Sequence, residues 1–484
     1  MPYTSRPHTT GRASGRPSAP RSGSRRPIAF WPVCVTAAVL VLAGCQDAPV
    51  APDPSSQPNP TAAASSLVGV DLMPGEALAR YRDAEREELV DGIVHTSFEL
   101  RVGPGPFDVV RLHRVVREQT RGMGGAPARP ARTHGSVFLA PGPALTFPAI
   151  FVDAGTEEPD AGTSLALFLA DAGIDVWGMD FGWAGVPVET TDFTFMEEWG
   201  IEYDMRHLLS GMSVARAIRA GTGQGRGTMH LLGYNYAGAV AYAAAGHETT
   251  LPPGRRQISG LIPVDLALRY ASSEAAALYA PCLAYAHLGG LLFDEDQPQF
   301  QSFQGLRLSS AAQRAINRPD ETVPTGPLAG LTFYDAALYP HTHTFELAPR
   351  EHWHMLAGVQ DQDGVHLRFT DPARWFHLAA SLPPYMPIRI NYEYEAASCP
   401  DEGEVPWDDH LEDIRVPILY LGAGGGFGTA GDRTALQTAS RDVTLHTVSL
   451  DSEPTRDFGV ADLMLADDAA DLVWSTLLDW LLEH

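Results

Sequence analysis

Runs typical of buried strands alternate with runs of helical period between residues 136 and 264, and this alternation constrains the fold more than any other feature. We predict strands at 136–140, 174–179, 228–232 and 259–264, and helices at 163–172, 201–219 and 236–245. Strands joined by helices in this order pair in parallel through right-handed crossovers, and helices cover both faces of the sheet. The sequence therefore predicts an α/β fold with a mostly parallel central sheet.

The alternation continues on both sides of this segment and is interrupted once. We predict the further strands at 96–102, 108–117, 416–421 and 442–449, and a last helix at 467–482. Between them lies 266–406, a stretch rich in Tyr, His and Pro in which the alternation fails. A sheet that resumes after a long insertion indicates one interrupted domain. We interpret 67–265 and 407–484 as the core and 266–406 as an inserted cap.

The N-terminus has the layout of a signal peptide. Residues 1–26 are basic, an apolar run follows at 28–42, and the run ends in Leu42-Ala43-Gly44-Cys45. The alternative is an uncleaved membrane anchor, which the short apolar run and its interruption by Pro32 disfavour.

The tetrapeptide that ends at Cys45 resembles the lipobox of bacterial lipoproteins. This resemblance implies cleavage after residue 44 and a diacylglyceryl thioether on Cys45. Residues 45–66 are rich in Pro, Ala and Ser and predict a disordered tether. We therefore expect a lipid-anchored protein of the bacterial cell envelope, on the periplasmic or outer-membrane face.

The chain is strongly acidic. Its formal net charge is −25, and removal of the six arginines of the predicted signal peptide takes the charge to −31. Such a surface repels nucleic acid and anionic head groups, so we expect no nucleic-acid partner and contact with the membrane only through the lipid. All 34 basic residues are arginine, which excludes a phosphate-binding P-loop lysine and a Schiff-base lysine. We expect no cofactor.

Two cysteines remain after Cys34 leaves with the signal peptide and Cys45 takes the lipid. In an oxidising compartment Cys282 and Cys399 can form one disulfide. The alternative is two buried free thiols.

Four local patterns, in chain order, resemble the α/β-hydrolase family, which includes lipases and esterases. They are VFLAPG at 137–142, LADAGIDVWGMD at 169–180, LLGYNYAG at 231–238 and DFGVADL at 457–463. The third resembles the nucleophile elbow of the family, and the fourth resembles the segment that carries its catalytic histidine. The resemblance implies an α/β-hydrolase fold with a cap and a pocket at Gly142, Tyr234, Asn235 and Tyr236.

The residues that carry the chemistry differ from this pattern. The position of the nucleophilic serine is Asn235, whose amide has no proton to lose and is a poor nucleophile. The position of the histidine that takes the proton is Val460, which cannot titrate. Pro141, which has no backbone N–H, stands before Gly142 in the oxyanion loop. Asp265, at the end of a predicted strand, is a candidate relic of the acid, or else an ordinary turn carboxylate.

A second constellation lies in the predicted cap. His341 and His343 precede His352 and His354 by eleven residues. In a strand, His-x-His places both rings on one face, and two such pairs are candidate zinc ligands. The alternative is a polar cap surface.

Three functions follow from these observations. The leading hypothesis is a non-hydrolytic lipoprotein that binds a lipid-like or aromatic small molecule in the former acyl pocket. The second is an active esterase or lipase-like hydrolase that uses displaced residues, among them the cap histidines and Asp265. The third is a metal-binding surface protein.

Overall fold

A computed structural model describes residues 74–119, 129–270, 275–299, 304–347, 350–399 and 405–484. All of them belong to the unit Cys34–His484. The predicted signal peptide and tether, with Cys45, lie outside the described residues. No helix in the described part of the chain has the length and apolar character needed to cross a bilayer.

Nine strands form one sheet in the order β1-β2-β3-β5-β4-β6-β7-β12-β13. The strands are β1 (Glu85–Val90), β2 (Ile93–Arg101), β3 (Val109–Arg117), β4 (Gly135–Ala140), β5 (Ile174–Asp180), β6 (Met229–Tyr234), β7 (Ile258–Val264), β12 (Ile418–Ala423) and β13 (Val443–Val448). The first three strands and β5 pair antiparallel, and the strands from β5 to β13 pair in parallel. The predicted mostly parallel sheet is confirmed.

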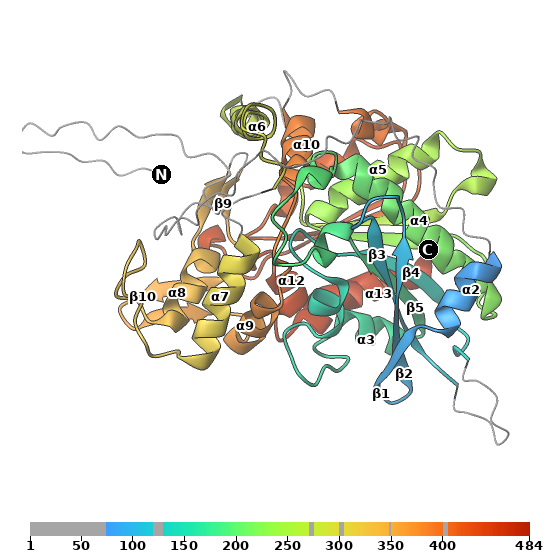
Figure 1. Cartoon of the computed structure of the whole chain (residues 1–484), viewed down its shortest axis with the longest axis horizontal. Coiled ribbons are helices and arrows are strands. Elements are labelled where there is room, and N and C mark those ends of the chain that lie inside the picture. The colour runs from blue at the N-terminus through green and yellow to red at the C-terminus, as the bar shows by residue number, and fades with distance from the viewer. Residues whose placement is uncertain (1–73, 120–128, 271–274, 300–303, 348–349, 400–404) are drawn as a thin grey trace, which may run out of the picture. The chain divides into compact units, whose positions relative to one another are not determined.

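Helices cover both faces of this sheet (Figure 1). They are α2 (Pro74–Arg82), α3 (Leu165–Asp171), α4 (Ile201–Gly221), α5 (Tyr236–Thr249), α11 (Asp432–Leu436), α12 (Asp462–Leu465) and α13 (Ser475–Glu483). One buried cluster joins the sheet to α2, α4 and α5, and a second joins its other face to α3, α12 and α13. Because each face is covered, β4, β6, β7 and β12 are almost wholly buried, as a parallel sheet requires.

Local sequence explains where these elements begin. Ser164 caps α3, since its hydroxyl accepts the backbone N–H of Leu167 at 3.2 Å. Strand β2 begins at Ile93, three residues before the predicted start, and β1 and α2 were not predicted. The turn after β2 is fixed by Asp108, whose carboxylate accepts the backbone N–H of Gly105 at 2.7 Å.

The cap contains helices and two small sheets. Its elements are α6 (Ala275–Gly289), α7 (Gln304–Asn317), α8 (Phe333–Thr342), β8 (Phe345–Leu347), β9 (Arg350–Trp353), β10 (Gly358–Asp361), β11 (Gly364–Leu367), α9 (Pro372–Ala380) and α10 (Ile388–Ser398). Helices α6 and α10 join the buried cluster of α4 and α5, whereas α7, α8 and α9 join that of α3 and α12. Cys282 of α6 is joined to Cys399, just after α10, by a disulfide.

Short helical turns complete the chain. They are η1 (Pro148–Val152), η2 (Gly182–Gly185), η3 (Thr194–Met196), η4 (Pro253–Arg255), η5 (Gly290–Asp294), η6 (Pro406–Asp408), η7 (Leu411–Asp413), η8 (Gly428–Ala430), η9 (Pro454–Arg456) and η10 (Ala470–Trp474). The predicted last helix at 467–482 thus corresponds to η10 followed directly by α13.

Candidate functional site

A sharp turn joins β6 to α5, and Asn235 occupies its centre. Its backbone has φ 52° and ψ −122°, a region that residues with a side chain rarely adopt. A Cβ on Gly233 would lie 2.2 Å from the carbonyl oxygen of Ala237, so this position admits only glycine. The strained strand-to-helix turn of a nucleophile elbow is therefore present, with an amide at its tip.

The polar groups of Asn235 bond to neighbouring backbone. Its backbone N–H donates to Val264 at 2.7 Å, and its side-chain amide donates to the carbonyl oxygen of Asp265 at 3.3 Å. Its backbone carbonyl oxygen accepts the backbone N–H of Gly238 at 2.7 Å. Asn235 therefore ties the start of α5 to the end of β7.

The two tyrosines beside Asn235 lie on opposite faces of the sheet and are buried. Tyr234 donates its hydroxyl to the carbonyl oxygen of Val460 at 3.1 Å. Tyr236 donates its hydroxyl to a carboxylate oxygen of Asp204 at 3.1 Å. A Cβ on Gly142 would lie 3.0 Å from the ring of Tyr234, which places the 141–147 loop against the elbow. Of the four predicted pocket residues, only Asn235 is partly exposed.

Asp204 is a buried acid that contacts the first residue of helix α5. It lies in the first turn of α4 and is 1% exposed. Burial raises the pKa of its carboxyl to about 8, and the hydrogen bond from Tyr236 offsets only part of that rise. The carboxyl is therefore mostly protonated at neutral pH.

Asp265 follows β7 and points at the glycine-rich turn after β12. It is fully buried, with φ 48°. Its carboxylate accepts the backbone N–H groups of Ala423 at 2.9 Å, Phe427 at 3.0 Å and Gly428 at 3.3 Å. A Cβ on Gly426 would lie 2.3 Å from this carboxylate. Asp265 thus holds the glycine-rich turn after β12 in place.

Val460 lies in the segment between β13 and α12 and is 1% exposed. Two carboxylates fix this segment. Asp457 accepts the backbone N–H groups of Leu450 and Phe458 at 2.6 and 2.8 Å. Asp462 accepts the backbone N–H of Gly459 at 2.8 Å, and burial raises its pKa to about 6.

A cap histidine enters the core at this point. His354 is fully buried, and its backbone bonds to Gly425 and Val460, at 3.0 and 3.3 Å. Its Nε2 bonds to the carbonyl oxygen of Asp457 at 2.7 Å, so Nε2 carries the proton of this bond. A Cβ on Gly425 would lie 2.2 Å from Nε2. His354 therefore lies between the glycine-rich turn after β12 and the 457–463 segment, in which the resemblance places the family's histidine.

The other three cap histidines lie elsewhere. His341 of α8 packs edge-on against Trp375 at 4.6 Å, and burial lowers its pKa to about 4. His343 stacks on Tyr339, and His352 lies on β9. Among the described residues no group of three or more His, Cys, Asp or Glu is placed to hold a metal ion. The prediction that the two His-x-His pairs lie close together required each pair to lie on a strand, whereas His341 belongs to helix α8.

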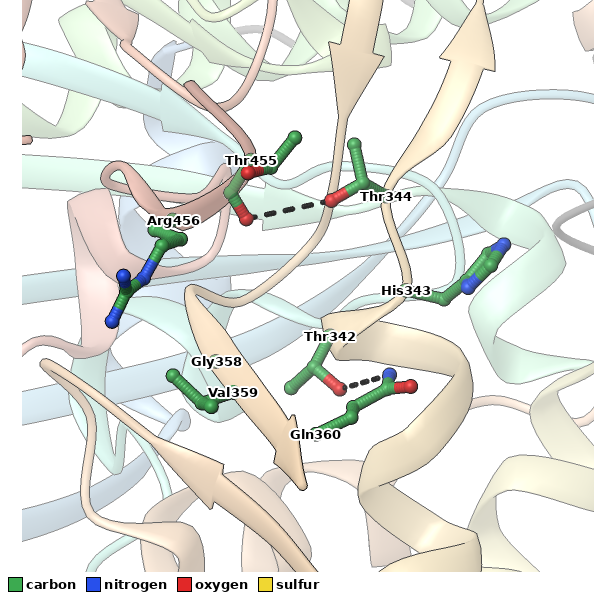
Figure 2. A pocket seen from close by; sticks show the side chains of 8 residues that line it. All are labelled: Thr342, His343, Thr344, Gly358, Val359, Gln360, Thr455 and Arg456. Carbon is green, nitrogen blue, oxygen red and sulfur yellow. Dashed lines mark hydrogen bonds between the residues drawn. The ribbon is translucent and has the colours of Figure 1, made fainter. Parts of the chain in front are cut away.

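Three cavities are described, and none is lined by Asn235. One, of about 270 Å³, lies between the cap and η9 and contains the hydrogen-bonded pair Thr342–Gln360 (Figure 2). Figure 2 shows His343 and Arg456 pointing away from this pair in opposite directions, so its two basic groups do not converge. A second, of about 320 Å³, is lined by the bonded pair Arg117–Asp171.

The third cavity, of about 420 Å³, contains polar residues that sequence reasoning missed. His95, His113 and Asp180 line it and are linked by hydrogen bonds. The signal was present as polar residues at every second position of adjacent strands, but the register of the strands was needed to bring them together.

Similar folds are found among solved structures. A candidate lipase from Sulfolobus solfataricus superposes with a TM-score of 0.55 at 17% identity, over 83% of this chain and 99% of that chain. The chain has the α/β-hydrolase fold. Two further structures are more distant. A monoglyceride lipase from Saccharomyces cerevisiae has 12% identity and a TM-score of 0.41, over 82% of this chain and 94% of that chain. An α/β hydrolase from Sphaerobacter thermophilus has 14% identity and a TM-score of 0.35, over 77% of this chain and 96% of that chain. No family model and no curated protein matches the sequence.

Within the α/β-hydrolase fold, the resemblance assigns the nucleophile to the turn after β6 and the histidine to the segment before the last helix. The structure places Asn235 at the first position and Val460 at the second. The turn at Asn235 has the strained backbone of an elbow, and neither Asn235 nor Val460 carries an ionisable side chain.

Proposed function

We propose that this protein is an exported, lipid-anchored α/β-hydrolase-fold protein that binds a lipid-like or aromatic small molecule without hydrolysing it. The observation that carries this proposal is Asn235 at φ 52° and ψ −122°. The backbone presents the side chain as an elbow does, but the amide cannot form an acyl-enzyme. Val460 offers no imidazole to accept a proton.

The surroundings of the elbow support binding. Cap helix α10 reaches the chain just after Asp265, where the hydroxyl of Tyr394 donates to the carbonyl oxygen of Ala267 at 3.0 Å. Tyr270 donates to the same oxygen at 2.9 Å. Both tyrosines bond to Ala267, two residues after Asp265, whose carbonyl oxygen accepts from Asn235, and aromatic rings there favour an apolar or aromatic ligand. For anchoring, the support is the tetrapeptide that ends at Cys45.

A fluorophosphonate probe and p-nitrophenyl acyl esters test the loss of hydrolysis. The wild-type protein should show neither labelling nor turnover. The variant N235S/V460H should be labelled at position 235, because the elbow geometry is already in place. Labelling of a wild-type serine together with ester turnover would contradict the proposal.

The anchor is tested separately by mass spectrometry of protein from a membrane fraction. The expected product begins at position 45 and carries the added mass of a diacylglyceryl group. Cys45→Ser should lose that mass and leave the membrane fraction. An unmodified N-terminus in the wild type would overturn this part.

One observation favours the second candidate, an active hydrolase with displaced residues. His354 lies against Gly425, and the carboxylate of Asp265 lies against the next residue, Gly426, so a base and an acid flank one turn. If this candidate were correct, His354→Gln and Asp265→Asn would each abolish a measurable esterase activity. The matched control is His410→Gln, a partly exposed histidine outside this turn.

A further inference from the structure

The cavity of about 420 Å³ lies on one face of the antiparallel part of the sheet, away from the elbow strand. The pairing register builds this face from alternate residues. Glu87 lies opposite His95, and Glu85 lies opposite Ser97. Ser97 in turn lies opposite His113, and Arg111 lies opposite Asp180. Because side chains alternate across a strand, these residues project to the same side of the sheet.

Three of these residues form a hydrogen-bonded chain. His113 Nε2 lies 3.1 Å from Asp180 Oδ2, and His113 Nδ1 lies 3.0 Å from His95 Nε2. The carboxylate can only accept, so a neutral His113 donates from Nε2 and accepts at Nδ1. His95 then donates from Nε2, which leaves its Nδ1 as an acceptor. Asp180 is held in place because its other oxygen accepts the backbone N–H of Phe147 at 2.6 Å.

The imidazole of His95 is neutral at pH 7. Burial, and next the neighbouring His113, lower its pKa to about 4. Its ring stacks on that of His113, with centroids 5.2 Å apart, and His113 stacks on Phe147 at 4.8 Å. The chain therefore offers a fixed, uncharged acceptor to the cavity.

The charges around the cavity are mainly negative. Its two arginines are already paired, Arg86 with Glu118 and Arg111 with both Glu85 and Glu99. With Glu87 and Asp180, five carboxylates stand against two guanidinium groups. An anion would meet an excess of like charge, whereas a cation gains from it.

We propose that this cavity binds a small organic cation that carries N–H donors, a guanidinium or ammonium compound. The carboxylates of Glu85 and Glu87 supply the attraction, and the acceptor on His95 receives an N–H. A neutral ligand of the same shape leaves the negative charge without a partner, and it should bind more weakly.

Titration calorimetry on the folded chain tests this with three probes of similar size: n-butylguanidinium, n-butylurea and valerate. The guanidinium should bind roughly ten-fold or more tightly than the urea, because hydrogen bonds between charged groups exceed neutral ones. Its affinity should also fall with added salt. Equal binding of guanidinium and urea, preference for valerate, or no binding of the guanidinium would each overturn the proposal.

Variants locate the site. Glu87→Gln and His95→Phe should each weaken n-butylguanidinium binding by roughly ten-fold, the first through charge and the second through loss of the acceptor while a flat ring is kept. Glu412→Gln, an exposed carboxylate on η7, makes the same charge change elsewhere and should leave binding unchanged. Thermal unfolding of each variant checks that it is folded. An equal loss in Glu412→Gln would show a nonspecific charge effect and overturn the assigned site.

Discussion

The nucleophile elbow and the cavity around His95 belong to one sheet, yet they divide the properties of an active site between them. The elbow has strained geometry, with Asn235 at φ 52°, but an inert side chain that bonds to the backbone carbonyl oxygen of Asp265. The cavity has ordinary strand geometry, but it contains a neutral imidazole, free volume and an excess of carboxylates. In this fold, a strained backbone and a cluster of titratable side chains therefore occur at two different places.

The difference also concerns burial. Near the elbow, Asp204 is buried and mostly protonated, and Tyr234 and Tyr236 use their hydroxyls within the core. At the cavity, the side chains of Glu85 and Glu87 are exposed to solvent, although Glu85 also pairs with Arg111. The polar groups around the elbow thus stabilise the core, whereas those at the cavity face solvent and can contact a ligand.

The largest expected effect is the pH dependence that Asp204 gives to the elbow region. Its folded pKa of about 8 exceeds the ordinary 3.8, so the folded state holds a proton that the unfolded state releases. Stability due to this group is full below about pH 4 and falls until about pH 8, by on the order of 5 kcal/mol. Urea unfolding of Asp204→Asn should show a flatter profile than the wild type over this range. Equal slopes would contradict the assignment.

The disulfide tests whether the two regions are independent. Cys282 and Cys399 are 117 residues apart and connect α6 to the end of α10 on the elbow side of the cap. The variant C282S/C399S should lose about 2–5 kcal/mol of unfolding free energy, because the unfolded chain gains freedom. Binding of n-butylguanidinium at the cavity should not change. A parallel loss of that binding would show that the regions are coupled.

Close packing at the elbow gives the next effect. In Gly233→Ala the new methyl group would lie 2.2 Å from the carbonyl oxygen of Ala237. We expect a loss of about 3 kcal/mol, measured by urea unfolding. The control is Gly227→Ala, where a Cβ meets nothing within 4 Å. Similar losses of unfolding free energy in both variants would contradict the close packing at Gly233.

The cavity should show the opposite pH dependence from Asp204. The folded pKa of His95, about 4, lies below the ordinary 6.5, so the unfolded state binds the proton first. Stability due to His95 is present above about pH 6.5 and is lost as pH falls towards 4, by about 2 kcal/mol for a partly exposed ring. His95→Phe should remove this acid-side loss in thermal unfolding at pH 4.5 and 7. A loss of the same size in the variant would assign it to other groups.

The smallest effect concerns the strain at Asn235 itself. Asn235→Ala should cost about 1 kcal/mol, because alanine tolerates positive φ less well than asparagine. Asn235→Gly should be close to neutral, since glycine has no side chain to clash there. Chemical denaturation of both variants provides the measurement. If alanine were the better tolerated of the two, the turn would not be strained.

Much of the fold could be predicted from the sequence because local patterns determine its strands and helices. Strands β4 to β7 and helices α3 to α5 were predicted within a few residues, since period and capping are local properties. The sharp turn at Asn235 lies where the resemblance of residues 231–238 to the α/β-hydrolase family places the elbow. The histidines of the cap show the limit. The His-x-His spacing does not say which neighbour each ring contacts: His341 and His354 are both buried, but against different parts of the molecule.

The sequence alone determined which side chains stand at the elbow and at 460, and therefore which chemistry those positions lack. Only the tertiary structure placed His354 between two turns and brought His95, His113 and Asp180 from three strands into one hydrogen-bonded chain. The physical reason is that strand register, which decides which residues face one another, follows from long-range pairing and not from any local pattern.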